Sequence, residues 1–139
     1  MKYGCDFAVA ARRHFRAALA LYELNTAGAQ PGSKAVAGYL FGLSGELAVK
    51  QMMLRLGMRP LPPEKKRDDP FYAHFPYLKT LLGGNGRLEG KLRQIADTST
   101  LFQNWDTAMR YAPSDQISHK WVDAWMTSAK QLIEDMHYC

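Results

Sequence analysis

A chain of 139 residues is long enough to bury one hydrophobic core without the help of disulfides or metal ions, so a single domain spanning residues 1–139 is expected. Hydrophobic residues make up 47% of the chain, which excludes a disordered protein, and two cysteines exclude a disulfide framework and predict a reducing, cytoplasmic location. The net charge of +5 permits an acidic partner such as nucleic acid. There is no visible signal peptide and no run of about 20 apolar residues, so we expect no membrane partner.

The first predicted helix runs from Asp6 to Asn25, where apolar residues recur at helical spacing. Arg12, Arg13 and Arg16 crowd its first half and form the densest basic patch on any predicted helix. This patch is a candidate nucleic-acid-binding face, because arginine neutralises backbone phosphates. The alternative interpretation is a solvated helix flank. Residues 26–33 are a short connection that predicts an antiparallel hairpin with the next helix.

The most apolar segment, Lys34 to Gly57, predicts a helix that begins after a Ser33 cap. Its apolar residues lie nearly all round the helix, which is typical of the buried member of a bundle. Gly38, Gly42 and Gly45 fall on one face. Each glycine costs about 1 kcal/mol of helix propensity, so we expect a neighbouring backbone to approach closely there, either another helix or a second subunit.

Glu46 lies near the middle of this helix, among apolar neighbours, with Lys50 one turn later. A buried carboxylate must be paired or neutral, and a lysine at i+4 has the favourable orientation for a pair. Two arrangements therefore fit the pattern: both side chains turn toward solvent, or they form an interior pair.

The following segment, residues 58–70, contains four prolines and a charge run, and predicts a solvated loop. Apolar spacing returns over residues 71–82 and predicts a helix, with Pro76 in its first turn and glycines after it. A short helix is expected over 87–96, another over 99–109, and a long last helix reaching Met136. We therefore predict an all-α fold, an antiparallel bundle of four main helices plus one or two short ones.

Arg110 and Tyr111 follow an aromatic-rich segment. The planar guanidinium of arginine bonds both oxygens of a carboxylate, and Glu46 is the carboxylate most in need of such a partner. We therefore expect Arg110 to pair with Glu46, with Lys50 at the edge. Together with Tyr111 they would form a polar cluster, either architectural or a pocket for a small anionic ligand.

Metal chemistry is not indicated by the sequence. The four histidines are scattered, without a His-x3-His or Glu-x-x-His spacing that would place two ligands on one helix face. We accordingly expect no metal and no other cofactor.

Several short pieces, taken in order, resemble HEPN domains, and the resemblance covers most of the chain. The pieces are the basic first helix with its histidine, Gly38-Tyr39-Leu40, the run from Gly45 to Lys50, His74 with Leu78, Leu81 and Leu82, and Trp105 with Arg110-Tyr111. The resemblance implies an α-helical bundle that often forms a homodimer. It also implies a setting in toxin–antitoxin, defence or RNA-processing systems, in which some members are ribonucleases and others bind nucleotides, RNA or partner proteins.

Catalytic HEPN members carry arginine and histidine separated by four to six residues, near the start of the last long helix. The arginine would stabilise phosphate charge and the histidine would act as acid and base with the RNA 2′-hydroxyl. Eight residues separate Arg110 from His119, so this pair does not match. Six residues separate Arg67 from His74, so this pair matches in spacing, but it lies before a middle helix.

Three functional hypotheses result. The first is a non-catalytic, HEPN-like homodimer that binds RNA, a nucleotide or a partner protein, or acts as a scaffold. The second is a metal-independent ribonuclease that uses Arg67 and His74. The third is a purely structural interaction module built on the glycine face.

Overall fold

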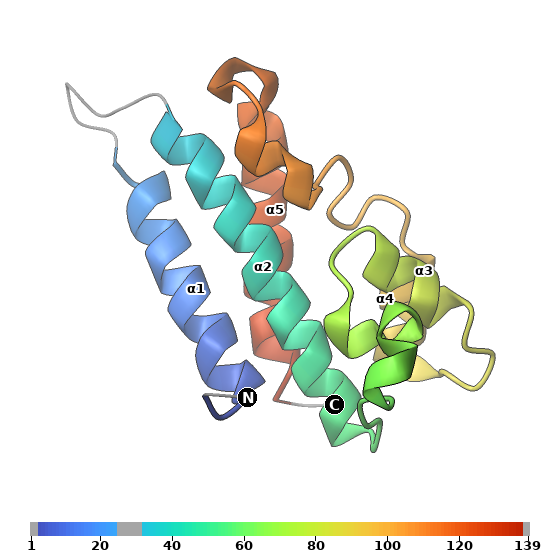
Figure 1. Cartoon of the computed structure of the whole chain (residues 1–139). Coiled ribbons are helices and arrows are strands. Elements are labelled where there is room, and N and C mark those ends of the chain that lie inside the picture. The colour runs from blue at the N-terminus through green and yellow to red at the C-terminus, as the bar shows by residue number, and fades with distance from the viewer. Residues whose placement is uncertain (1–2, 25–31, 138–139) are drawn as a thin grey trace.

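The computed structural model describes residues 3–24 and 32–137, and within these ranges every regular element is helical. Three long helices form the main body: α1 (Phe7–Tyr22), α2 (Gly32–Arg55) and α5 (His119–Asp135). Figure 1 shows α1 beside α2 and α5 behind α2, and α2 packs against both. The all-α prediction is therefore confirmed. No helix in the described ranges is long and apolar enough to cross a membrane.

Two short helices, α3 (Tyr77–Gly83) and α4 (Gly90–Asp97), pack against each other on the side of α2 opposite α1 (Figure 1). Four 3-10 helices complete the described chain. They are η1 (Pro63–Asp68), η2 (Pro70–Tyr72), η3 (Thr107–Tyr111) and η4 (Ser114–Gln116). The predicted connection over 26–33 lies largely outside the described residues, as does Cys139.

The burial of α2 follows the predicted pattern. Phe41, Val49 and Met53 are fully buried and Glu46 is 2% exposed, although at about 100° per residue they point in different directions around the helix axis. A helix can bury side chains that point in so many directions only when neighbouring elements cover most of its circumference. The segment is therefore the central helix of the fold, as its composition predicted.

Side-chain caps fix the starts of the two flanking helices. Asp6 accepts a hydrogen bond from the Val9 backbone N–H at 3.0 Å and caps α1, and Ser118 accepts one from the Lys120 N–H at 3.2 Å and caps α5. Each cap satisfies a donor that the first helical turn leaves without a partner.

Two predicted helices differ in the structure. Over residues 99–109 the chain forms turns followed by η3, because Phe102 and Asn104 have φ values of 52° and 70°. Left-handed residues cannot continue a right-handed α-helix. Over residues 71–82 the α-helix starts only at Tyr77, because Ala73 is extended at the end of η2. The proline-rich loop, in turn, contains η1, which begins at Pro63.

The glycine face of α2 is filled by aromatic rings from the same chain. A β-carbon at Gly38 would lie 3.0 Å from the Trp125 ring, one at Gly42 would lie 2.0 Å from the Trp105 indole, and one at Gly45 would lie 2.5 Å from Phe102. Another helix of the chain, α5, does lie against this face through Val122 and Trp125, as one of the two expected arrangements has it, but the added β-carbons would meet side chains and not its backbone. Large flat side chains, rather than another main chain, occupy the space that the missing β-carbons leave.

Candidate functional site

Glu46 is the centre of a buried polar cluster at the contact between α2 and the segment before α3. Its carboxylate is 2% exposed and accepts hydrogen bonds from His74 Nδ1 at 2.9 Å and from the Phe75 backbone N–H at 3.0 Å. Lys50 Nζ lies 3.5 Å from Oε2 of the same carboxylate. Three donors thus compensate for the lost hydration of one buried charge. Of the two arrangements that the sequence left open, the structure has the interior pair.

Lys50 is the buried cation of this cluster, and its side chain is 6% exposed. Burial lowers the pKa of the Lys50 ammonium below the ordinary value of 10.5, while the negative charge of Glu46, and more weakly that of Asp69, opposes the shift. Removal from water is the larger of these effects, because hydration favours the charged form of an amine. The ion pair lies within α2 and is buried at some cost in stability, while the bonds from Glu46 to His74 and to the Phe75 N–H connect the helix to the segment before α3.

A pH-dependent stability difference follows for Lys50→Met. Because the folded state holds the Lys50 proton less tightly than the unfolded chain, the free energy of unfolding of the parent chain should contain a component that rises with pH, up to about 10.5. The variant has no amine there and should lose this rise. Urea unfolding from about pH 7 to about pH 10 measures the difference. The matched control is Lys130→Met on the exposed side of α5; the same slope in both variants would contradict the assignment.

Asp69 is a second buried carboxylate, 1% exposed, and it closes the loop that contains η1. Its Oδ2 accepts from the Leu61 N–H at 2.8 Å and its Oδ1 accepts from the Phe71 N–H at 2.9 Å. One side chain therefore ties together the two ends of a nine-residue loop. The charged residues of this loop are therefore attached to a backbone that Asp69 fixes at both ends.

His74 connects the buried cluster to the surface. Its Nδ1 faces Glu46, yet 54% of its side chain is exposed. Because a carboxylate only accepts, Nδ1 is the donor in this bond, and the neutral ring then carries its lone pair on Nε2. No described residue bonds Nε2. A histidine fixed in this way can accept or donate a proton at its exposed nitrogen.

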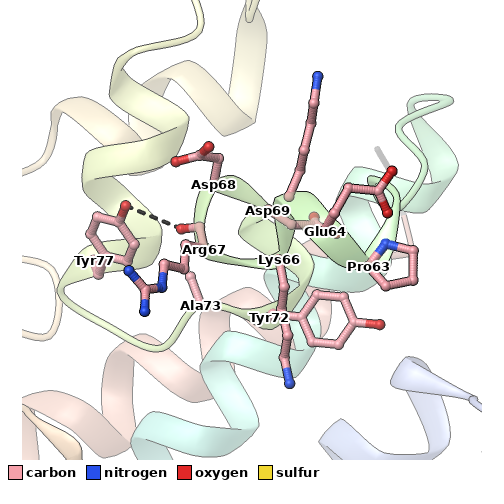
Figure 2. A pocket seen from close by; sticks show the side chains of 10 residues that line it. Pro63, Glu64, Lys66, Arg67, Asp68, Asp69, Tyr72, Ala73 and Tyr77 are labelled. Carbon is pink, nitrogen blue, oxygen red and sulfur yellow. Dashed lines mark hydrogen bonds between the residues drawn. The ribbon is translucent and has the colours of Figure 1, made fainter.

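A groove of about 760 Å³ lies beside this histidine, lined by residues 63–69 together with Tyr72, Ala73 and Tyr77. In Figure 2 the Lys66 side chain extends beside the Tyr72 ring, whereas the Arg67 guanidinium lies beside the Tyr77 ring on the other side of the loop. The Tyr77 hydroxyl donates to the Arg67 backbone carbonyl at 3.2 Å. His74 follows directly after the lining residue Ala73 but does not itself line the groove that Arg67 lines.

Arg110 and Tyr111 do not join the cluster, and the predicted Glu46–Arg110 pair was wrong. Arg110 is exposed; it donates to the Tyr39 hydroxyl at 3.4 Å and lies 4.9 Å from the centroid of the Tyr111 ring. Tyr39 precedes Glu46 by seven residues, which is about 10 Å along a helix. Arg110 therefore meets α2 two turns away from the carboxylate, whose donors come from His74, Phe75 and Lys50.

The basic residues of α1 lie outside this cluster. Arg12 donates to His137 Nε2 at 2.9 Å near the end of α5, and since a guanidinium only donates, the imidazole must be the acceptor. Arg13 and Arg16 are exposed. None of the three lines the groove beside Tyr72 and Tyr77. The α1 patch is thus a separate surface from the histidine and its loop.

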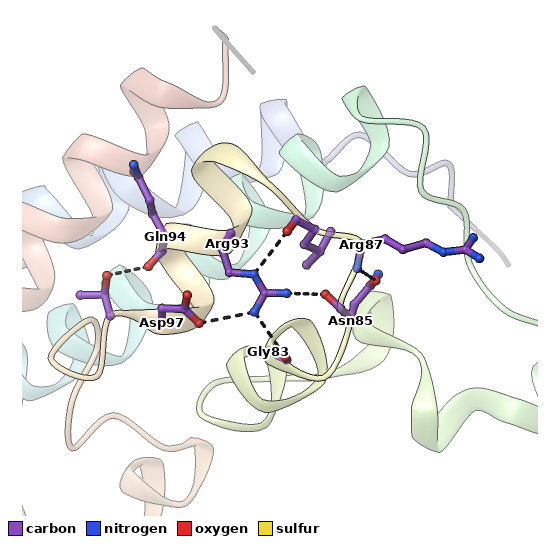
Figure 3. Close-up of polar contacts among 8 residues, drawn as sticks. Gly83, Asn85, Arg87, Arg93, Gln94 and Asp97 are labelled. Carbon is purple, nitrogen blue, oxygen red and sulfur yellow. Dashed lines mark hydrogen bonds and ion pairs between the residues drawn. The ribbon is translucent and has the colours of Figure 1, made fainter.

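Arg93 is a further arginine that the sequence patterns did not single out. Figure 3 shows its guanidinium bonded to the backbone carbonyls of Leu88, Gly83 and Asn85 and to the Asp97 carboxylate. These bonds hold the turn between α3 and α4. The guanidinium of Arg93 is therefore engaged in structural contacts. No local sequence motif could have indicated them, because every residue has a backbone carbonyl.

Sequence patterns also missed Tyr72, Tyr77 and Asp69 as parts of the site. Tyr72 and Tyr77 are about half exposed, and their only sequence signal was their position next to the charge run. Within the described ranges, no group of three or more histidine, cysteine, aspartate or glutamate residues is placed to hold a metal ion.

Comparisons with models of known protein families, with curated proteins and with solved structures find no match to this chain. The site must therefore be interpreted from its own chemistry.

Proposed function

We propose that this chain is a HEPN-like, non-catalytic RNA-binding domain that holds the phosphate backbone on the loop containing η1. The observation that carries the proposal is the groove, in which exposed Lys65, Lys66 and Arg67 stand on a loop closed by Asp69. Because the loop backbone is already fixed, only its basic side chains would have to be ordered when they contact phosphates. The net charge of +5 supports attraction of a polyanion.

RNA binding is expected to depend on salt and on this loop. The double variant K66A/R67A should bind a fluorescein-labelled 12-nucleotide oligo(A) more weakly than the parent chain. It should also reduce the slope of log affinity against log salt by about 1 to 2, roughly one for each lost phosphate contact. Fluorescence anisotropy at several salt concentrations measures both quantities. Removing two exposed cations should not disturb the core, and circular dichroism verifies the fold.

The α1 patch provides the matched control. R13A/R16A removes the same amount of charge from an exposed surface outside the groove. A larger loss of RNA affinity for this variant than for K66A/R67A would indicate that RNA binds to α1 and not to the loop. If the parent chain does not bind RNA at low salt, the proposal is wrong.

A metal-independent ribonuclease is the second candidate, favoured by the Glu46–His74 bond. His74 Nε2 would take the proton of an RNA 2′-hydroxyl, and that oxygen would attack the neighbouring phosphorus. The 5′-oxygen of the next nucleotide would leave and take a proton from water, giving a 2′,3′-cyclic phosphate and a free 5′-hydroxyl. Arg67 would stabilise the negative charge on the phosphate. The buried carboxylate supplies the fixed ring orientation that such a step requires.

This candidate predicts RNA cleavage in EDTA that falls by about 10²- to 10⁴-fold in His74→Ala. Denaturing gels with labelled RNA measure it, and a strand with a single 2′-deoxy position should resist cleavage there. His119→Ala is the control, since that histidine is also exposed but lies at the start of α5. Equal cleavage by the parent chain and His74→Ala would exclude catalysis by this residue.

We also propose that the chain forms a homodimer in the cytoplasm. The exposed apolar side chains of Val9 on α1 and Val36 on α2 support this, being 46% and 50% exposed. Multi-angle light scattering at micromolar concentration should give twice the monomer mass of 15.7 kDa. A monomer mass across the micromolar range would contradict the dimer.

A further inference from the structure

The two tyrosines of the groove are exposed where a nucleic acid would lie. Tyr72 is 47% exposed and Tyr77 is 48% exposed. Large aromatic residues are usually buried more deeply, because burial of their area stabilises the fold. In Figure 2 the Tyr72 ring and the Lys66 side chain lie together on one side of the loop.

Tyr72 and Lys66 form a defined pair. The Lys66 ammonium lies 5.0 Å from the centroid of the Tyr72 ring. A single nucleotide carries a phosphate and a base within reach of each other, so its phosphate can contact the ammonium while its base lies against the face of the ring that the ammonium does not cover. Neither contact reads a particular base, since every base has a π-face.

The backbone that carries Tyr72 and Lys66 is held in place by contacts on both sides of the loop. Tyr72 is the last residue of η2, whose first turn is capped by Asp69, and Lys66 lies within the loop that the same carboxylate closes. On the other side of the loop, the Tyr77 hydroxyl bonds the Arg67 carbonyl at 3.2 Å. A fixed ring loses little freedom when a base stacks on it.

We propose that Tyr72 is a base-stacking subsite, with Lys66 holding the adjacent phosphate, so that the groove takes single-stranded rather than duplex RNA. This rests on the proposed RNA-binding function and assigns the strand form and the contacting ring. In a duplex the bases are already stacked on one another, so their faces are closed to Tyr72. Phosphates alone would then be available, and the affinity gained from stacking would be lost.

The test compares a labelled 12-nucleotide oligo(A) with a blunt 12-base-pair RNA duplex in anisotropy titrations at one salt concentration. Tyr72→Ala should weaken binding of the single strand by about 5- to 150-fold and leave binding of the duplex unchanged. Tyr72→Phe keeps the ring and should bind as the parent chain does. Tyr111→Ala is the matched control, because Tyr111 is 79% exposed on a different element.

The outcomes separate this inference from the proposed function. If Tyr72→Ala binds the single strand normally while K66A/R67A binds weakly, the stacking subsite is overturned and phosphate binding at the loop stands. Equal affinity of the parent chain for single strand and duplex also overturns the subsite. If the parent chain binds neither RNA, both proposals fail together.

Discussion

Replacing Glu46 with alanine is expected to lower the free energy of unfolding by about 3–5 kcal/mol. The variant leaves the Lys50 ammonium buried without the carboxylate that lies 3.5 Å away. It also removes the acceptor of the buried Phe75 N–H, which bonds Glu46 at 3.0 Å. An unpaired buried charge and an unsatisfied buried donor are both costly. Urea unfolding followed by far-UV circular dichroism measures the change.

Two further variants separate charge from shape at this position. Glu46→Gln keeps an acceptor oxygen of similar geometry and should cost less than Glu46→Ala. The double variant E46A/K50M removes both ions and should recover part of the loss, because no unpaired charge remains. If Glu46→Ala costs less than about 1 kcal/mol, the cluster does not hold α2 in the way its contacts indicate.

Gly42→Ala is expected to destabilise the chain by about 2–3 kcal/mol, although alanine is the better helix former by about 1 kcal/mol. The added β-carbon would lie 2.0 Å from the indole of Trp105, far inside any non-bonded contact. The indole cannot easily move aside. It is buried, its N–H donates to the Gly38 carbonyl at 3.1 Å, and it stacks on Tyr39 with the ring centroids 5.6 Å apart.

Thermal and urea unfolding measure this loss, and near-UV circular dichroism should show a changed tryptophan environment. Gly83→Ala is the control. Gly83 ends α3, and an added β-carbon there would meet no other atom within 4 Å. That variant should be neutral or up to about 1 kcal/mol more stable. Equal stability of Gly42→Ala and the parent chain would show that the ring relocates freely.

The buried residues of α2 illustrate what residue patterns alone can predict. Helix propensity and the all-round apolar distribution predicted a central buried helix, and side chains such as Phe41 and Met53 are indeed fully buried. These properties are local to the helix or depend only on its hydrophobicity. They are set by one segment and do not require knowledge of what the segment packs against.

The partners of that helix depended on longer-range geometry. The pairing of Glu46 with Arg110 was inferred from the charge and planar shape of the guanidinium, but Arg110 meets α2 at Tyr39. Likewise the glycine face predicted a close approach without indicating what would approach. The left-handed residues Phe102 and Asn104 redirect the chain so that Phe102 and Trp105 reach that face. Neither residue carries the glycine signal by which such a backbone position is usually recognised.

By itself, then, the sequence determined the helical class of the fold, the central place of α2 and the need of Glu46 for a partner. All three follow from periodicity, propensity and the cost of burying a charge, which act within a single segment. Only the tertiary structure decided that His74, 28 residues away, supplies that partner, and that Asp69 closes the charged loop before it. The reason is physical: a polar side chain bonds whichever donor the folded chain brings within about 3 Å, and that depends on every intervening turn.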